Sequence, residues 1–278
     1  MFRRIIVYVI FITGMLIFFY PIVSNWLSSK VHYTVISEHN EVIANMSDEQ
    51  KKKELEKAKE YNESVQESSI PIEDPFAENI EEEVATGYFD VLDIGEALGY
   101  LEIPAIDVEL PIYHGVSEKV LQKGIGHMSN SSFPIGGHGT HSALTGHRGL
   151  PSSKLFRHLD KVQIGDVFYI NTLGETLAYE VDDIKIVLPN ETQWLDIDPE
   201  KDYVTLITCE PYMINTHRLL VRGERIPYEE AIEVSANDIS QNGQKINKWI
   251  LVISLVGITG LVAYLMRKKW LRKSEHDV

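Results

Sequence analysis

Val204-Thr205-Leu206-Ile207-Thr208-Cys209 is the stretch of the chain that most restricts its fold and its chemistry. Its β-branched and aliphatic residues are typical of a buried strand. The strand ends on the only cysteine among 278 residues, so the chain offers this thiol no partner for an internal disulfide. The thiol is therefore either a core side chain or a nucleophile, and this stretch alone leaves both interpretations open.

The region around this stretch, from Gly99 to Ile226, alternates short β-rich runs with Gly, Pro, Asn and Asp turns. Helical signals are few, with Val120-Leu121 and Lys154–Leu159 as short candidates. The pattern predicts an all-β barrel or sandwich. The expected strands are Tyr100–Ile103, Val108–Tyr113, Ser142–Thr145, Val167–Asn171, Thr176–Ile186, Tyr203–Thr208 and Leu219–Arg222.

The segment before the β-rich region has a different composition. Residues 47–69 are rich in Glu, Lys, Gln and Ser, with only a thin apolar stripe. Ser47 followed three residues later by Gln50 is the pattern of a helix N-cap, so we expect a helix here, solvated and acting as a spacer. Residues 70–86 contain Pro71, Pro75 and many acids, which predicts a loop.

Two uncharged apolar runs lie near the ends of the chain. Ile5–Val23 follows Arg3 and Arg4, and Trp249–Met266 precedes a basic tail. As helices, both have about the length needed to cross a hydrocarbon core of roughly 30 Å. The basic flanks predict that both termini are cytoplasmic and that residues 24–248 lie outside. A cleaved signal peptide is the alternative for the first run.

Charge limits the partners of the external part. Residues 24–248 hold 19 Lys and Arg against 39 Asp and Glu, a net charge of −20. Such a surface as a whole disfavours nucleic acid and anionic lipid.

Three motifs in this order resemble those of the sortase family. Thr205-Leu206-Ile207-Thr208-Cys209 resembles the cysteine signature, Thr145–Gly149 the histidine segment and Asn215–Gly223 the arginine segment. The resemblance spans roughly residues 70–230. It implies a closed eight-stranded β-barrel with the active site at one end of the strands that carry the cysteine and the arginine. It also implies that Cys209, His147 and Arg218 are catalytic and that no cofactor is needed.

Two further segments resemble class C sortases, the pilin polymerases. Ile103–Gly115 is similar to their barrel-entry segment, and Asp74-Pro75-Phe76 to their Asp-Pro-aromatic lid motif. By this resemblance, Asp74 pairs with Arg218 or another cation, and Phe76 shields the thiol. The alternative is that Asp-Pro begins an ordinary turn and Phe76 is a packing residue.

The chemistry of the residues is consistent with this resemblance. A free thiol has a pKa of about 8.5 and an imidazole of about 6.5, so a reactive ion pair needs support from the site. Arg218 is permanently cationic and suited to stabilise a thiolate or an oxyanion. We expect Cys209 to attack a Thr–Gly carbonyl and His147 to protonate the leaving amine. Thr208 is either a substrate-orienting residue or a plain strand residue.

Other histidines carry weaker signals. His138 and His141 lie near His147, but a convincing set of carboxylates or thiolates for a metal is lacking, so no metal is expected. His217, beside Arg218, is expected to be structural.

The whole chain is thus expected to be an enzyme that joins pilin subunits carrying LPxTG-like signals to an acceptor lysine. A housekeeping sortase that attaches proteins to the cell wall is the alternative, and a non-catalytic tethered β-barrel is a remote one. No LPxTG-like signal precedes the second apolar run, which argues against a sortase substrate. The predicted division is an anchor (1–23), a helix and lid region (24–98), the barrel (99–230), a linker (231–248), a span (249–266) and a cytoplasmic tail (267–278).

Overall fold

The structure, a computed structural model, describes residues 2–68, 72–77 and 86–232. The predicted second span and basic tail lie outside the described residues, as do nearly all of the linker and residues 69–71 and 78–85 of the lid region. The predicted domain boundaries there stay predictions.

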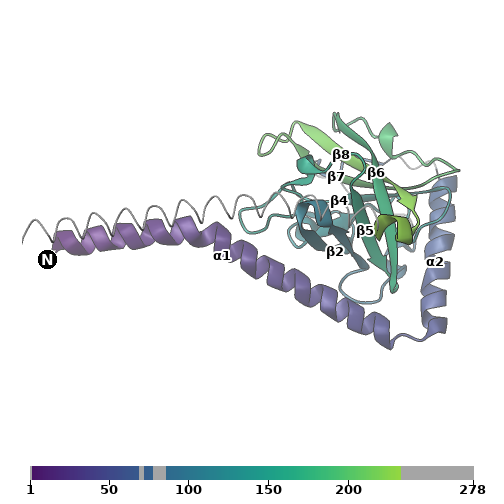
Figure 1. Cartoon of the computed structure of the whole chain (residues 1–278), viewed down its shortest axis with the longest axis horizontal. Coiled ribbons are helices and arrows are strands. Elements are labelled where there is room, and N and C mark those ends of the chain that lie inside the picture. Colours follow the sequence, from purple (N-terminus) through teal and green to yellow (C-terminus); the bar gives the residue numbers. More distant parts are fainter. Residues whose placement is uncertain (1, 69–71, 78–85, 233–278) are drawn as a thin grey trace, which may run out of the picture. The chain divides into compact units, whose positions relative to one another are not determined.

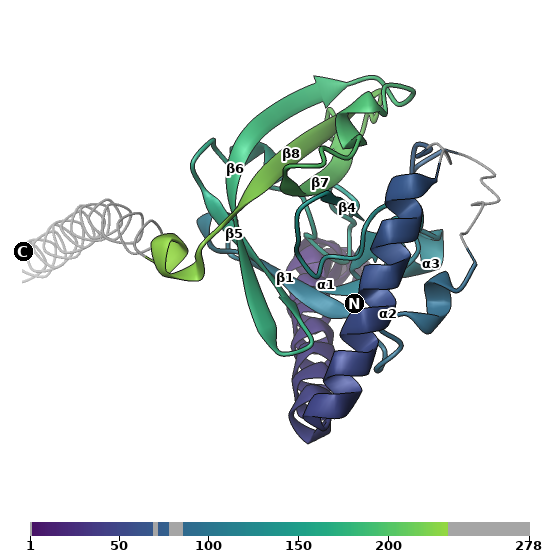
Figure 2. The ribbon, with the colours of Figure 1, turned by 90° about the vertical axis from the view of Figure 1, so that its right-hand side faces the viewer.

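The β-rich region forms a closed barrel of eight strands, in the order β1-β2-β3-β4-β7-β8-β6-β5 (Figures 1 and 2). The expected closed barrel is therefore confirmed. Neighbouring strands are antiparallel except for β2/β3 and β4/β7. The strands are β1 (Gly99–Ile103), β2 (Val108–His114), β3 (Ile125–His127), β4 (Thr140–Thr145), β5 (Val167–Thr172), β6 (Glu175–Val187), β7 (Asp202–Glu210) and β8 (His217–Ile226).

The strand β7 shows how the barrel wall is built. Because side chains alternate along a strand, Val204 and Leu206 join the main core, whereas Ile207 joins a second apolar cluster. We call the latter the outer cluster; it consists of Met128, Ala143, Val187, Leu195, Ile207 and Leu220. Because β7 is buried on both faces, its sequence does not alternate between apolar and charged residues.

Helices are few in the barrel region. The structure has α1 (Phe2–Asn45), α2 (Asp48–Glu67) and α3 (Glu118–Leu121), with 3₁₀ turns η1 (Tyr88–Asp90), η2 (Pro104–Ile106), η3 (Leu159–Lys161) and η4 (Gln193–Leu195). The predicted helix over Lys154–Leu159 is wrong, because that segment forms turns and only its last residue, Leu159, belongs to η3. The three-residue strand β3 is too short for any periodicity to predict it.

The helix α2 is not the solvated spacer that its composition suggested. Ser47 caps it with the predicted capping box, but Ala58, Tyr61 and Val65 are buried in the main core. Asn62 accepts a hydrogen bond from the Phe133 backbone N–H and donates one to the Phe133 carbonyl. The thin stripe is thus sufficient to dock α2 along the barrel (Figure 2).

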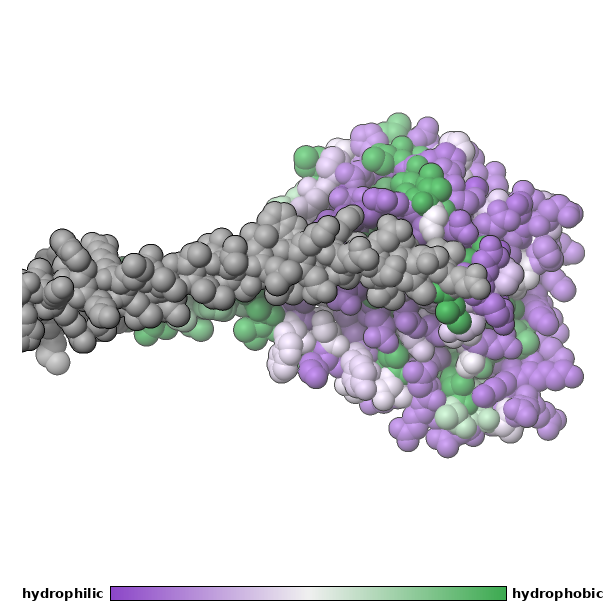
Figure 3. All heavy atoms as spheres, in the orientation of Figure 1, coloured by the Kyte–Doolittle hydropathy of each residue, from purple (hydrophilic) through white to green (hydrophobic). Residues whose placement is uncertain are grey.

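The helix α1 is long and changes direction along its length (Figure 1). It contains Pro21, which cannot donate a backbone hydrogen bond. Among the described residues, only the stretch Val9–Asn45 is long and apolar enough to be a candidate membrane span. Where the N-terminal part of α1 shows beside the grey atoms in Figure 3, its side chains are apolar, whereas the barrel surface in the same view is mainly hydrophilic.

Candidate active site

Cys209 and Arg218 are neighbours across the β7–β8 ladder. They are directly paired in its antiparallel register. Both are largely buried, with 6% and 7% of their surfaces exposed. Cross-strand pairing therefore brings the thiol and the guanidinium together at one end of the barrel.

His147 reaches the same end because β4 runs parallel to β7. Thr145, the last residue of β4, is in register with Ile207, and the Gly146 N–H donates to the Ile207 carbonyl at 3.0 Å. A Cβ on Gly146 would lie 2.8 Å from Ile125 Cδ1 and 2.9 Å from Phe156 Cδ2, so a larger residue here would force these side chains to shift. The loop that carries His147 therefore leaves the sheet beside the cysteine strand.

These three side chains line one pocket of about 610 Å³. Cys209, His147 and Arg218 come from β7, the loop after β4, and β8. The other lining residues are Pro75, Phe76, Ala77, Val116, Ser117, Glu118, Leu121 and Asn215. The pocket thus combines a nucleophile, an acid–base group and a fixed cation, the parts required for acyl transfer.

Asp74 forms a bidentate ion pair with Arg218. Its carboxylate accepts from Nε at 2.6 Å and from Nη2 at 2.7 Å. The side chains of Arg218 and Asp74 are only 9% and 10% exposed. Arg218 also donates through Nη1 to the carbonyls of Asn215 and His217. In this state, the guanidinium is occupied by the chain itself.

Phe76 lies between the cation and the histidine. Its ring centre is 5.1 Å from Arg218 Cζ and 5.8 Å from the His147 ring centre. Phe76 and Ile72 both pack against the outer cluster. We call residues 72–77 the lid segment. It is held against the barrel by an ion pair and by apolar contacts, and its aromatic ring lines the pocket that contains the thiol.

The surroundings of Cys209 set the chemistry of the thiol. Burial raises its pKa, Asp74 adds to that rise, and the positive charges of Arg218 and Arg148 oppose it. With the lid segment in place, the protonated thiol is therefore favoured.

Arg148, next to His147, is a site residue that sequence reasoning missed. It is 8% exposed and contacts the Glu210 carboxylate, and Nη2 lies 3.3 Å from Asp160. Its Nη1 also donates to the Cys209 carbonyl at 3.4 Å. Arg148 therefore joins the histidine loop to the cysteine strand. The sequence feature that could have identified Arg148 is its position inside the histidine segment Thr145–Gly149.

Glu118 is a second missed residue. Its Oε2 lies 3.3 Å from His147 Nε2, at the start of α3, and its side chain is 66% exposed. The carboxylate is thus within ion-pair distance of the imidazole. No motif distinguishes Glu118 in the sequence, because α3 is far from His147 along the chain.

Thr208 does not contact the pocket as a substrate-orienting residue would. It is fully buried, and its hydroxyl donates to the Gly146 carbonyl at 2.7 Å. This position agrees with the alternative of a plain strand residue, and a substrate-orienting role stays a prediction. Thr208 holds the histidine loop against β7.

The other histidines are engaged elsewhere. His141 is buried against the Asp196 carbonyl and the Thr205 hydroxyl, and His138 contacts the Glu200 carbonyl. His217 contacts the Thr216 hydroxyl. Within the described residues, no group of three or more His, Cys, Asp or Glu side chains is arranged to hold a metal ion.

Comparison with known proteins gives a consistent result. The sortase domain family matches residues 101–226. Sortase C1 of GBS pilus island 1 superposes with a TM-score of 0.66 and 42% identity, over 71% of this chain and 93% of that one. Streptococcus pneumoniae sortase C gives a TM-score of 0.65 and 46% identity, over 70% and 97% of the two chains.

A curated relative, sortase D of Bacillus subtilis (strain 168), is 33% identical over 137 residues. That match covers 48% of this chain and 66% of the relative, slightly less than two thirds of its length.

Proposed function

This chain belongs to the sortase family, and on that premise we propose that it is a membrane-anchored cysteine transpeptidase that joins pilin subunits. The observation that supports this most is that Cys209, His147 and Arg218 line one pocket under a lid segment. A similar structure, sortase C1, belongs to a pilus island, which supports pilins as the substrate class.

The first half of the reaction forms a thioester. The Cys209 thiolate attacks the carbonyl carbon of Thr in an LPxTG-like signal, and the developing oxyanion is stabilised by Arg218. The Thr–Gly bond breaks as the His147 imidazolium gives its proton to the leaving amine. Glu118, 3.3 Å from His147, supports the charged imidazole at the start of this step.

The second half transfers the acyl group to an acceptor pilin. A lysine amine attacks the thioester carbonyl, the C–S bond breaks, and an isopeptide bond forms. Neutral His147 takes the proton of the attacking amine, and the thiolate is restored.

The lid segment controls access to this chemistry. Phe76 lines the pocket, and Asp74 occupies the guanidinium of Arg218. A peptide that needs either group must displace both contacts, so lid opening precedes binding.

Anchoring follows from the apolar runs. The exposed N-terminal half of α1 forms one span, and residues 249–266 form a second, with both termini in the cytoplasm. A reporter fused after Val278 is expected in the cytoplasm and a tag near residue 60 outside. A C-terminus accessible from outside in intact cells would contradict this topology.

The test of the enzymatic proposal uses the purified full-length protein with candidate pilins and mass spectrometry. The expected product is an isopeptide bond between a threonine and an acceptor lysine. Cys209→Ala is expected to abolish both the thioester and the product. Polymerisation by that variant would refute the mechanism, and transfer only to a cell-wall peptide amine would indicate a housekeeping sortase.

A further inference from the structure

The catalytic end of the barrel is attached to α1 at the point where its apolar run ends. Ser24 donates a hydrogen bond to the Ser152 carbonyl at 3.4 Å, and Asn25 Oδ1 accepts one from the Lys154 backbone N–H at 3.0 Å. Ser24 and Asn25 are the first residues after the run that ends at Val23. Ser152 and Lys154 lie in the loop that begins with His147. The active-site loop is therefore fixed beside the exit of α1 from its apolar stretch.

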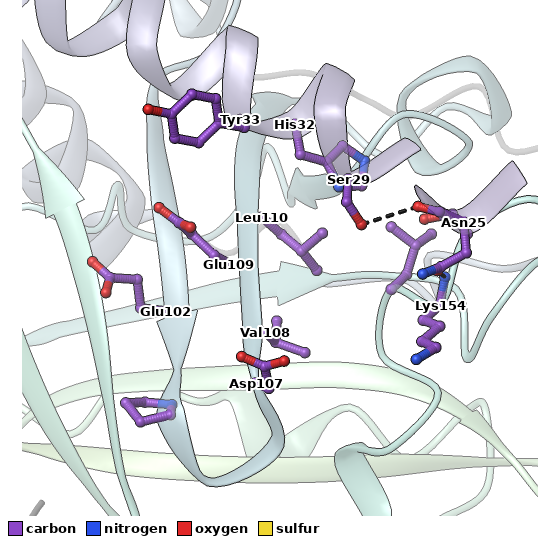
Figure 4. A pocket seen from close by; sticks show the side chains of 13 residues that line it. Asn25, Ser29, His32, Tyr33, Glu102, Asp107, Val108, Glu109, Leu110 and Lys154 are labelled. Atoms are coloured by element: carbon purple, nitrogen blue, oxygen red, sulfur yellow. Dashed lines mark hydrogen bonds between the residues drawn. The ribbon is translucent and has the colours of Figure 1, made fainter. Parts of the chain in front are cut away.

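The same part of α1 has the side chains of a membrane interface. Tyr20 and Trp26 are 55% and 61% exposed, and such aromatic residues are typical of the headgroup level. Beyond them, α1 lies on the barrel across a pocket of about 450 Å³ (Figure 4). Figure 4 shows Asn25 beside Lys154 at one end of this pocket. The loop contact at Asn25 thus lies at the expected depth of lipid headgroups.

That loop carries a concentrated positive charge. Lys154, Arg157, His158 and Lys161 all lie within eight residues of this loop. Lys154 and Lys161 are exposed. The acidic Asp160 among them is in contact with Arg148. The cluster therefore presents cations to the solvent, although residues 24–248 carry a net charge of −20.

Next to this basic loop is an exposed apolar tip. Between β7 and β8, Tyr212 is 44%, Met213 80% and Ile214 66% exposed. Arg157 Cζ lies 5.8 Å from the centre of the Tyr212 ring, which connects the tip to the basic loop. Cations beside exposed apolar and aromatic side chains are the combination that binds the surface of an anionic bilayer.

We propose that the basic loop (residues 150–161) and the apolar tip (residues 211–216) form a docking surface for anionic phospholipid, so that the catalytic pocket opens at the membrane surface. This inference rests on the proposed membrane anchoring by α1. The cations contact headgroup phosphates, and Met213 and Ile214 enter the boundary between headgroups and acyl chains. The net charge of the ectodomain does not prevent this, because charges beyond about 8–10 Å are largely screened at physiological ionic strength.

The test places a photo-crosslinking residue, p-benzoylphenylalanine, at Met213 in the full-length protein. The protein is reconstituted in nanodiscs of phosphatidylcholine, with or without phosphatidylglycerol. The matched control carries the same residue at exposed Lys52 in α2. That position follows the far end of α1, about 30 Å along the helix from Asn25. A lipid adduct is expected at Met213, more in the anionic discs, and none at Lys52.

Charge variants test the electrostatic part. Lys154→Glu with Lys161→Glu is expected to lower the adduct yield in anionic discs by about fivefold or more, because each cation near an anionic surface contributes to binding. The equal charge change in α2, Lys52→Glu with Lys53→Glu, is expected to leave the yield unchanged.

Four outcomes would overturn the inference. Protein retained in the discs without an adduct at Met213 would refute docking while leaving the anchor intact. Equal yields in both lipids would refute anionic phospholipid as the ligand, and an adduct formed with an added sorting-signal peptide instead of lipid would assign the tip to substrate. Protein that does not stay in the discs at all would refute the anchoring itself.

Discussion

Removing the Asp74 carboxylate is expected to open the lid segment and to make Cys209 more reactive. In Asp74→Ala, Arg218 loses two charge-assisted hydrogen bonds of 2.6 and 2.7 Å but keeps its bonds to two backbone carbonyls. A hydrogen bond to a charged group contributes about 1.5–3 kcal/mol, and the open pocket lets water replace part of the loss. We therefore assign about 1.5–3 kcal/mol to the Asp74–Arg218 ion pair as a whole, as its net contribution to the closed state of the lid segment. Since about 1.4 kcal/mol is tenfold, the open population rises by about 10- to 100-fold.

The same change also moves the titration of the thiol. Asp74 contributes to the raised pKa of Cys209, so its removal lowers that pKa. The thiolate is the reactive form, and its fraction increases with pH. The variant is therefore expected to reach its maximal alkylation rate at lower pH than the wild type, and that maximum is expected to be higher.

The assay is the alkylation rate of Cys209 by iodoacetamide across the neutral to alkaline range, with the full-length protein. Asp182→Ala is the matched control, because Asp182 makes a similar bidentate pair with Arg222 at 3.0 and 2.6 Å. Neither residue lines the catalytic pocket. Phe76→Ala is expected to raise the maximum as well, since its ring lines that pocket. Curves for Asp74→Ala that coincide with those of the wild type and the control would show that the ion pair does not gate the site.

Three further predictions concern individual residues. His147→Ala is expected to lower the transpeptidation rate by about 10²–10⁴-fold, whereas His217→Ala changes it little; the reverse order would show that the wrong histidine was chosen. Arg148→Met is expected to raise the pKa of Cys209, opposite in sign to Asp74→Ala, because Arg148 lowers that pKa; an unchanged alkylation midpoint would contradict this. Burial lowers the pKa of His141 to about 4 in the folded protein. Because the unfolded chain binds this proton already near pH 6.5, the free energy of unfolding is at its full value above about pH 6.5 and decreases as the pH falls toward 4. Urea unfolding of the full-length protein should show this loss, up to about 3 kcal/mol for His141, and a slope unchanged in His141→Gln would refute the assignment.

Much of the barrel was predictable from the sequence because its signals are local. Seven of the strands follow from β-branched runs bounded by turn residues, and the capping box at Ser47 follows from two residues three positions apart. The helix predicted over Lys154–Leu159 is wrong. Its buried apolar residues have the spacing of one face of a short helix, but here they hold a series of turns against the core. The docking of α2 was missed because a strongly charged composition hid a stripe that the barrel buries.

Three sequence motifs predict the candidate catalytic residues, but they do not predict the surroundings of these residues. The sequence identifies Cys209, His147 and Arg218 as functional types at characteristic positions. Two further residues of the site were missed. Arg148 stands inside the histidine segment, but a charged side chain in a loop is usually solvated and nothing local indicates its burial. Glu118, whose side chain is 66% exposed, belongs to no motif. Their roles depend on which strands are neighbours in the sheet.

By itself, the sequence determines the strand pattern, the apolar runs and the identity of the reactive groups, because these depend on residues close together in the chain. Only the tertiary structure decides that the cation paired with Asp74 is Arg218, 144 residues away, and that both side chains are nearly buried. It also decides that Ser24 and Asn25 hold the loop that follows His147. Such contacts arise from strand register and barrel closure, which bring distant segments together, and no local pattern encodes the burial that gives an ion pair its strength.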